Sequence, residues 1–284
     1  MMREPVIAVS YLPFLRENST VLDVFKLARA FGFRYMTINS IYGEVGLIPL
    51  SRFREDFNRT AESFSRLFEK FSLYPVAFSI DTVEDLVGLY HRLRDREFRE
   101  FLKIVFRIAS FFEASTVSIR KLAFRNRTEE EIHEMIVRLR TLARKYNVKL
   151  ALNTHRGTVL EDINFALDVV QSFSDVYLAF EPATYVTRGI DFDSYKVLLP
   201  YTQHLVVYDA DRGDENIMVE FGKGSVPFSK IVDELIDMGF DGPFTIEYFK
   251  FEKLNIAYDG DPIEDSLRAR AFLENAIKKR LHNR

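Results

Sequence analysis

Strand-like and helical patterns alternate from one end of this chain to the other. The strand-like stretches, rich in β-branched and aromatic residues, cover 6–12, 35–40, 74–81, 115–121, 148–153, 175–181, 204–209 and 243–249. The helical patterns that follow them cover 20–31, 51–72, 94–113, 128–146, 159–173, 191–199, 227–238 and 263–280. Strands that alternate with helices are typical of a parallel sheet, and eight such units predict an α/β fold, a (β/α)₈ barrel.

A doubly wound open sheet is the alternative architecture. It is less well supported, because no glycine-rich turn follows the first strand and no second domain is indicated. The length of 284 residues is normal for one barrel, so we expect a single domain over residues 1–284. The widest connections after strands are 39–50, 81–93, 182–190 and 209–226, and barrel enzymes build their sites from such loops.

Helix boundaries are also indicated. Candidate N-caps are Ser19 or Thr20, Ser51, and Thr128 with Glu131 at capping-box spacing. Gly32 and Gly239 stand where helices should end, just before a strand.

The composition excludes several classes of site and partner. The chain has no cysteine, which removes disulfides, thiolate zinc sites and cysteine nucleophiles. No apolar run reaches the length of a membrane span, and no signal peptide begins the sequence, so we expect a cytoplasmic protein without membrane partners. The net charge of −3 argues against nucleic acid as a partner, because proteins that grip duplex phosphates usually show a basic face.

Alternate residues of the predicted strands differ in character. One register is large and apolar and should face the helices: Ile7, Val9, Met36, Ile38, Val76, Phe78, Val117, Ile119, Leu150, Leu152, Phe244 and Ile246. The other is small and then polar and should face the barrel axis: Ala8 and Ser10, Thr37 and Asn39, Ala77 and Ser79, Thr116 and Ser118, Ala151 and Asn153, Ala179 and Glu181, Thr245 and Glu247. The polar member always comes later, which predicts a polar pocket at the C-terminal mouth.

Glu181 and Glu247 are the predicted catalytic residues. Inward-facing carboxylates need a cation, a metal or a bound proton, and two of them can act as acid and base on either side of a carbon. The alternative is an ion pair with Arg120, Lys121 or Lys250. We expect Glu247→Gln to abolish any activity with little change in melting temperature, as for other mouth positions.

Further polar residues near the strand ends are predicted to contact a substrate: Asn39, Asp81, Arg120, Asn153, His155, Tyr208 and Asp209. His155 lies just past the fifth strand, where it could act as a base or a ligand. His204 opens the seventh strand and should be a core histidine deep in the barrel.

The segment "FGKGSVPFSKIVDELIDMGFDGPFTIEYF", Phe221 to Phe249, resembles the last quarter of the xylose isomerase-like TIM barrels. The similar elements are Gly222-Lys223-Gly224, then Gly239-Phe240-Asp241-Gly242, then Glu247 at a strand end. This superfamily includes sugar isomerases and epimerases, inosose dehydratases, hydroxypyruvate isomerases and endonuclease IV. The resemblance is specific in the last hundred residues and looser before them.

The resemblance implies a divalent metal held by Glu, Asp, His and Glu after strands five to eight. This sequence departs from that pattern, with Asn153, Glu181, Val206 and Glu247 at the four positions. Hard cations accept oxygen ligands, so Mg²⁺ or Mn²⁺ could bind through Glu181 and Glu247, whereas zinc favours nitrogen and sulfur.

Three functional hypotheses follow from the residues and the resemblance together. The first is an isomerase or epimerase that moves protons on a small, sugar-like hydroxy-carbonyl substrate, with a metal, Arg120 or His155 stabilising the enediolate. The second is an inactive barrel that binds a ligand or protein. The third, a nuclease like endonuclease IV, is opposed by the missing histidines and the acidic balance. The phenylalanine-rich stretch 52–71 should pack in the core but could also mediate formation of a homo-oligomer.

Overall fold

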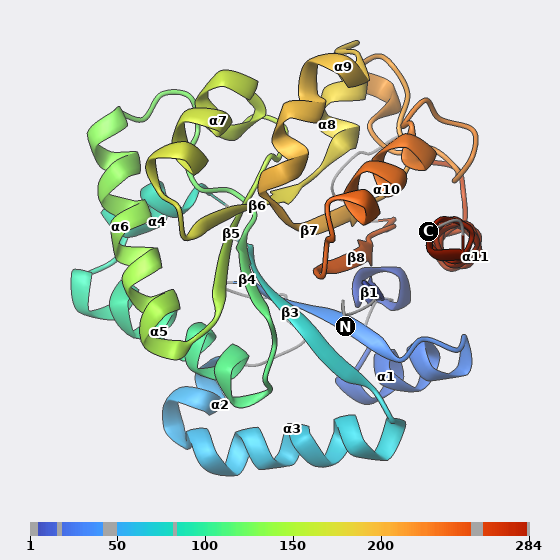
Figure 1. The fold of residues 1–284 in the computed structure, drawn as a ribbon. Coiled ribbons are helices and arrows are strands. Elements are labelled where there is room, and N and C mark those ends of the chain that lie inside the picture. Colours follow the sequence, from blue (N-terminus) through green and yellow to red (C-terminus); the bar gives the residue numbers. More distant parts are fainter. Residues whose placement is uncertain (1–4, 16–18, 42–49, 82–83, 251–257, 283–284) are drawn as a thin grey trace.

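The fold is a closed barrel of parallel strands, seen in a computed structural model that describes residues 5–15, 19–41, 50–81, 84–250 and 258–282 (Figure 1). The ring order follows the sequence order from β1 to β8, and β8 pairs with β1. The strands are β1 (Val6–Ser10), β2 (Tyr35–Ile41), β3 (Tyr74–Asp81), β4 (Thr116–Ile119), β5 (Lys149–Asn153), β6 (Val176–Phe180), β7 (Thr202–Val207) and β8 (Pro243–Ile246). This topology confirms the predicted (β/α)₈ barrel and rules out the open sheet.

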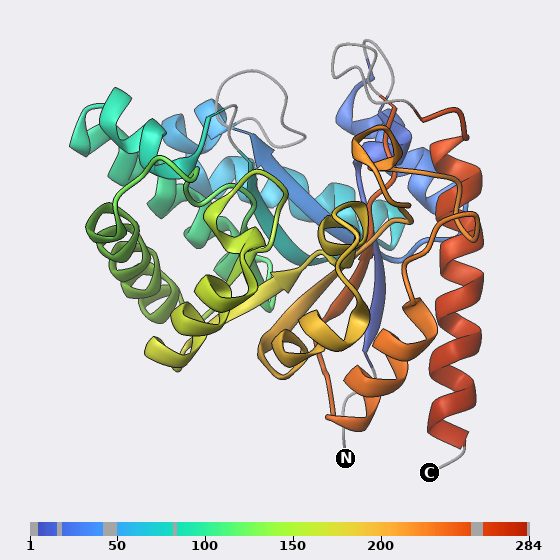
Figure 2. The same cartoon turned by 90° about the horizontal axis from the view of Figure 1, so that it is seen from above.

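Helices surround the strands (Figures 1 and 2). They are α1 (Val21–Ala30), α2 (Leu50–Glu55), α3 (Phe57–Phe71), α4 (Leu86–Arg92), α5 (Asp95–Phe111), α6 (Glu129–Tyr146), α7 (Ile163–Ser172), α8 (Pro182–Thr187), α9 (Phe192–Tyr195), α10 (Phe228–Asp237) and α11 (Pro262–His282). Short 3₁₀ helices are η1 (Leu12–Phe14), η2 (Val159–Glu161), η3 (Lys196–Tyr201) and η4 (Asp214–Asn216). Every predicted helical stretch overlaps at least one of these helices.

Most of the predicted helix ends are correct. Thr20 and Thr128 each form a complete capping box, with Asp23 and Glu131 as the partners. Gly32 and Gly239 follow α1 and α10 with positive φ angles of 80° and 78°, a conformation that costs glycine least.

The predicted helix over 51–72 is wrong in one detail, because it is two helices. Ser51 lies inside α2 and is not an N-cap; Asp56 begins α3 instead, accepting a hydrogen bond from the Arg59 amide. The helices α4 and α8 were also missed, since both are short and lie in stretches that were interpreted as loops. Phe64 and Phe68 of α3 are buried, as the helical spacing predicted.

Strand register defines which side chains fill the barrel interior. Paired residues of neighbouring parallel strands point to the same face. The pairs that establish the interior face are Ser10 with Thr37, Asn39 with Ser79, Ser79 with Ser118, Ser118 with Ala151, Asn153 with Ala179, Ala179 with His204, and Val206 with Thr245. Thr37 and Thr245 show that this face points into the barrel, because their hydroxyl oxygens lie 2.7 Å apart although β1 separates their strands. The predicted axis-facing register is therefore confirmed.

The two ends of the barrel are distinct. The start of β1 and the last turn of α11 lie at the same end, and the strands run from there toward the opposite mouth (Figure 2).

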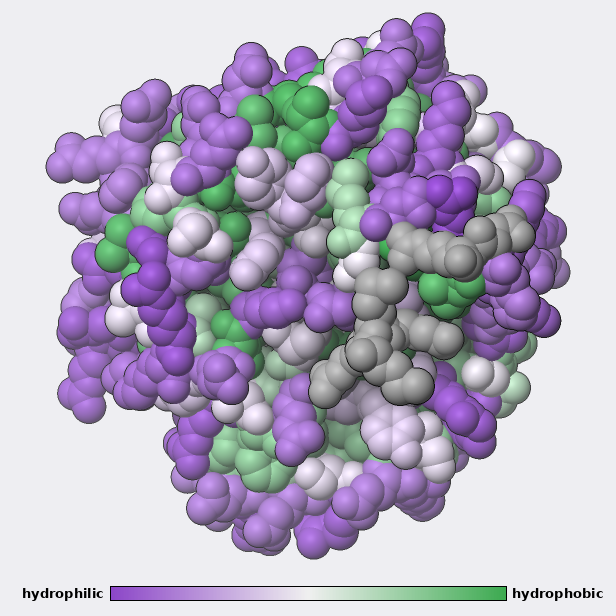
Figure 3. Space-filling model, viewed as in Figure 1, coloured by the Kyte–Doolittle hydropathy of each residue, from purple (hydrophilic) through white to green (hydrophobic). Residues whose placement is uncertain are grey.

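In the space-filling view, hydrophilic side chains dominate the outline and hydrophobic ones show as separate patches between them (Figure 3). Across the described parts of the chain, none of the helices has the length and apolar composition that a membrane crossing requires.

Candidate functional site

A buried polar cluster inside the barrel is built by His204 with Thr37 and Thr245. His204 Nε2 lies 2.7 Å from the Thr245 hydroxyl, and the imidazole is 2% exposed. Burial lowers the pKa of His204 to about 4, so the ring is neutral at physiological pH. The prediction of a core histidine is confirmed.

Glu181 lies directly after β6 and is completely buried. Its carboxylate accepts hydrogen bonds from the Tyr208 hydroxyl and from His155 Nδ1, the latter at 3.1 Å. Its own backbone N–H donates to the Thr154 hydroxyl at 2.9 Å. Burial alone would raise the pKa of Glu181, but the attraction of His155, together with Arg120, lowers it to about 2. The carboxylate is therefore ionised at neutral pH.

Glu247 lies just beyond β8 and forms a buried ion pair with Arg120, which lies just beyond β4. The side chains are only 5% and 8% exposed. Burial raises the pKa of Glu247, although Arg120 acts in the opposite direction. Of the alternatives considered for the carboxylates, an ion pair with Arg120 is what the structure contains at this position.

Asp81, at the end of β3, completes the charged group. One carboxylate oxygen lies 3.8 Å from Arg120 Nε and the other lies 3.8 Å from Lys121 Nζ. Burial alone would lower the pKa of Arg120, but the charges of Glu247 and Asp81 raise it above its usual value. The mouth thus gathers acidic and basic side chains from the ends of β3, β4, β6 and β8.

Beside this charged group, several neutral polar atoms are buried without partners. Within the described residues, no hydrogen-bond partner reaches Ser10 Oγ, either amide atom of Asn39, or Asn153 Oδ1. These residues are 0%, 0% and 4% exposed and share the interior register established above. An unpaired buried polar atom costs about 1–3 kcal/mol, so these groups favour a site that receives hydrogen bonds from a ligand or from water.

Asp209, unlike the other predicted substrate contacts, is bound by the backbone of a loop. Its carboxylate accepts hydrogen bonds from the backbone N–H groups of Gly222, Gly224, Val226 and Ala210. A side chain at residue 224 would collide with this carboxylate, which accounts for the glycine there. Asp209 therefore holds the loop between β7 and α10, and its oxygens are already engaged by protein amides.

Two residues that the sequence reasoning missed belong to the mouth. Tyr11 follows β1 and is 1% exposed; burial and the nearby charges of Asp81 and Glu247 raise its pKa.

Glu161 accepts hydrogen bonds from Arg125, from Arg188 at 2.6 Å and from the Gly157 amide at 2.6 Å. It therefore ties together the loops that follow β4, β5 and β6, including the one that carries His155. The position of Tyr11 next to Ser10 was the available signal, whereas Glu161 had none.

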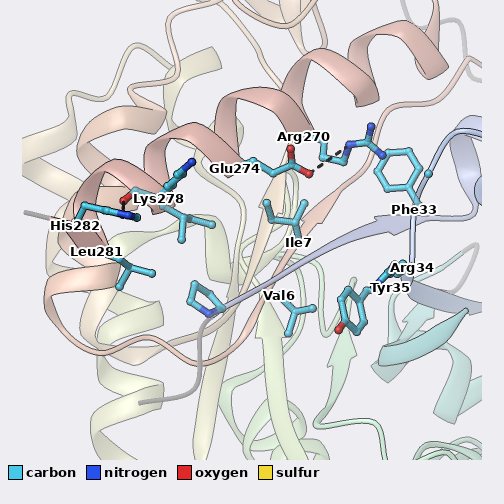
Figure 4. A pocket seen from close by; sticks show the side chains of 13 residues that line it. Val6, Ile7, Phe33, Arg34, Tyr35, Arg270, Glu274, Lys278, Leu281 and His282 are labelled. Carbon is cyan, nitrogen blue, oxygen red and sulfur yellow. Dashed lines mark hydrogen bonds and ion pairs between the residues drawn. The ribbon is translucent and has the colours of Figure 1, made fainter. Parts of the chain in front are cut away.

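A surface groove of about 580 Å³ lies at the opposite end of the molecule, between the start of β1 and the last turns of α11 (Figure 4). It is lined by Val6, Ile7, Arg270 and Lys278 among others, and an Arg270–Glu274 ion pair crosses its wall. None of the predicted site residues lines it. The convergence of polar side chains at the mouth, and not this groove, is therefore the candidate site.

Comparison with known proteins agrees with the barrel fold. The family model described as xylose isomerase-like TIM barrel matches residues 25–276. The chain belongs to this family. A search of curated protein sequences returned no significant match.

Solved structures resemble this xylose isomerase-like barrel closely in fold and distantly in sequence. A xylose isomerase domain protein from Planctomyces limnophilus has 16% identity and a TM-score of 0.72, covering 99% of this chain and 100% of its own. A xylose isomerase-like TIM barrel protein from Mycobacterium smegmatis, in complex with magnesium, has 16% identity, a TM-score of 0.73 and 98% coverage of both chains. D-allulose 3-epimerase from Methylomonas sp., in complex with D-allulose, has 13% identity and a TM-score of 0.72, covering 96% of this chain and 98% of its own.

The described residues of this xylose isomerase-like barrel do not fit a divalent cation. No group of three His, Asp or Glu side chains among them is arranged to hold a metal ion. Both predicted metal ligands have protein partners instead, Glu247 in its ion pair with Arg120 and Glu181 in hydrogen bonds with His155 and Tyr208. A divalent ion between the carboxylates would meet the fixed positive charge of the guanidinium.

Proposed function

We propose that the protein is an isomerase or epimerase that moves a proton on a small, neutral, sugar-like hydroxy-carbonyl substrate. One observation carries the proposal: two buried carboxylates, Glu181 and Glu247, come from β6 and β8 at the mouth, and their pKa values are shifted in opposite directions. Pairs of carboxyl groups with divergent pKa values can supply the acid and the base of a proton-transfer reaction. The family membership and the D-allulose 3-epimerase neighbour support the same reaction class.

The roles of the two groups follow from their environments. Glu181 is ionised, so it can take a proton from the carbon next to the substrate carbonyl. Glu247 has the raised pKa and can return a proton, either to the opposite face of that carbon or to its neighbour. Tyr208 and His155 hold the Glu181 carboxylate in place.

The neutral polar groups of the mouth support a hydroxylated substrate. A sugar hydroxyl both donates and accepts hydrogen bonds, and so does the Asn39 amide. Ser10 and the Asn153 carbonyl oxygen add a hydroxyl and an acceptor, so a polyol could satisfy all of these atoms together. Asn39, Asn153, Asp81, Arg120 and His155 therefore remain proposed substrate contacts.

The proposal is tested by proton exchange with solvent, which needs no knowledge of the product. The protein is incubated in D₂O with a panel of neutral ketoses and aldoses, and loss of the proton signal next to the carbonyl is followed by NMR. We expect exchange with at least one sugar, and its loss in Glu181→Gln and Glu247→Gln. Glu130→Gln is the matched control, because Glu130 is exposed on α6. Full exchange in either site variant would refute the assignment of that carboxylate.

A barrel that binds a ligand without catalysis is the second candidate. The Arg120–Glu247 ion pair favours it, because a carboxylate held by a guanidinium is not free to accept a proton. Ligand binding without deuterium incorporation in any sugar would support this candidate. The cytoplasmic location, the absence of a nucleic-acid partner and the formation of a homo-oligomer stay predictions.

A further inference from the structure

The guanidinium of Arg120 lies among three carboxylates contributed by three different strand ends. It donates a hydrogen bond from Nη1 to Glu247, lies 3.8 Å from Asp81, and is close enough to Glu181 for that charge to affect its pKa. In a closed ring that runs from β1 to β8, β4 and β8 are opposite one another. Arg120 therefore reaches across the mouth, and its positive charge lies where the carboxylates converge.

We propose that Arg120 replaces a divalent metal ion as the group that stabilises negative charge on the substrate oxygen. This inference rests on the proposed isomerase or epimerase function. It makes Arg120 a catalytic residue and makes the reaction independent of metal. The neighbour that holds magnesium would then differ from this chain in how the charge is supplied.

The carboxylates around Arg120 have basic neighbours in the protein itself. Asp81 has a second cationic neighbour in Lys121 at 3.8 Å, and Glu181 has His155 at 3.1 Å. Each carboxylate of the group therefore has a basic side chain beside it. Buried carboxylates that already have such partners gain less from a metal ion than isolated ones do, and the guanidinium also repels the ion.

The chemistry of proton transfer suits a fixed guanidinium. When a carboxylate removes the proton next to a carbonyl, the C–H bond breaks and its electron pair forms the carbon–carbon double bond of an enediolate. The carbonyl oxygen gains the negative charge, and no oxidant or reductant is required. A guanidinium carries five N–H donors, more than its contact with Glu247 uses, so Arg120 can donate to this oxygen. Proton donation by Glu247 restores the carbonyl and leaves Glu181 protonated and Glu247 ionised, and exchange of these protons with water returns both groups to their starting states.

The first test measures metal binding directly. Protein stripped with chelator is titrated with Mn²⁺, and free Mn²⁺ is followed by electron paramagnetic resonance. We expect no saturable uptake by the wild type up to about 1 mM, and at least about tenfold tighter uptake by Arg120→Met, whose carboxylates have lost their cation. Stoichiometric binding by the wild type that disappears in Glu247→Gln would overturn the proposal. So would an Arg120→Met variant that is folded by circular dichroism yet takes up no more Mn²⁺ than the wild type.

The second test separates this inference from the proposed function. Deuterium exchange is measured with and without chelator, and in Arg120→Lys, which keeps the charge but not the planar fork of donors. We expect exchange by the wild type to survive the chelator and exchange by Arg120→Lys to fall about a hundredfold in kcat, which corresponds to the loss of one well-placed donor. Exchange that the chelator abolishes and Mn²⁺ restores would sink the role of Arg120 and leave the isomerase proposal intact. If no sugar exchanges at all, the isomerase proposal fails, and the Mn²⁺ titration still decides whether Arg120 excludes a metal.

Discussion

The buried ion pair between Glu247 and Arg120 gives a quantitative prediction about stability. Because Glu247 is almost fully buried, the small stability effect expected for an exposed mouth position no longer applies. We expect Arg120→Met to destabilise the protein more than Glu247→Gln does. Losing Glu247 leaves Arg120 with Asp81 at 3.8 Å and the charge of Glu181, whereas losing Arg120 leaves Glu247 without its cation.

The magnitudes follow from the burial of the pair. Two unit charges about 4 Å apart attract by roughly 4 kcal/mol at an effective dielectric constant near 20. Removing one partner of a buried pair costs about 3–5 kcal/mol, and we expect Arg120→Met in that range. For Glu247→Gln we expect about 2 kcal/mol, because the remaining carboxylates offset part of the loss. At about 2–4 °C per kcal/mol for a chain of this size, the melting temperature of Glu247→Gln should fall by about 4–8 °C.

The assay is urea and thermal unfolding followed by far-ultraviolet circular dichroism, since the chain has no tryptophan. The double variant completes a thermodynamic cycle and should be less destabilised than the sum of the single variants by more than about 1 kcal/mol. Two results would refute the reasoning. One is a Glu247→Gln variant at least as destabilised as Arg120→Met. The other is additivity within about 0.5 kcal/mol, which would mean that the two side chains are not energetically coupled.

Three further predictions concern single residues and partners. The folded pKa of Glu181, about 2, lies below its value in the unfolded chain, so the stabilisation by Glu181 is present above about pH 4.5 and is lost as the pH falls toward 2. In urea unfolding, the free energy of unfolding of the wild type minus that of Glu181→Gln should therefore shrink by about 3 kcal/mol over this pH range, and a constant difference would contradict the prediction. Asp209→Ala removes the acceptor of four backbone amides and should lower the free energy of unfolding by about 3 kcal/mol and speed proteolysis at 219–226. Asp214→Ala, at an exposed residue of the same connection, is the control, and equal proteolysis of the two variants would count against this role of Asp209. In filter binding, a duplex with an abasic site should be retained no better than an intact duplex at any salt concentration, and selective, strongly salt-dependent retention would favour the nuclease hypothesis.

The fold could be predicted because its main signals are local. Strand alternation has a period of two and separates the helix-facing register from the interior one, so Thr37 and Thr245 could be assigned to the interior before any contact was known. Short elements gave no comparable signal. The helices α4 and α8 have only 7 and 6 residues, too few for a helical pattern to stand out from a loop. Ser51 was misplaced because a serine near a helix start is a common but not decisive feature.

The location of the site's side chains at the mouth could be predicted, but their contacts with one another could not. Glu181, Glu247 and Arg120 were all identified as mouth residues from their places in the strands. Which of them contact one another depends on closure of the barrel, which places the ends of β4 and β8 opposite each other so that Arg120 reaches Glu247, 127 residues away in the sequence. The partners of Asp209 are likewise set by the path of a loop, and loop geometry is not encoded in a periodic pattern.

The choice between an enzyme and a binding protein reduces to a competition for the guanidinium of Arg120. While Arg120 holds Glu247, that carboxylate cannot exchange protons with a substrate. A ligand oxygen that takes the place of the Glu247 carboxylate at Arg120 would release this carboxylate, at a cost comparable to the 2 kcal/mol or so expected for Glu247→Gln. Hydrogen bonds to Asn39, Asn153 and Ser10, at about 1 kcal/mol each, are enough to offset that cost. The unpaired polar atoms of the mouth are therefore what allows a hydroxylated ligand, and not an apolar one, to open the ion pair and expose the carboxylate.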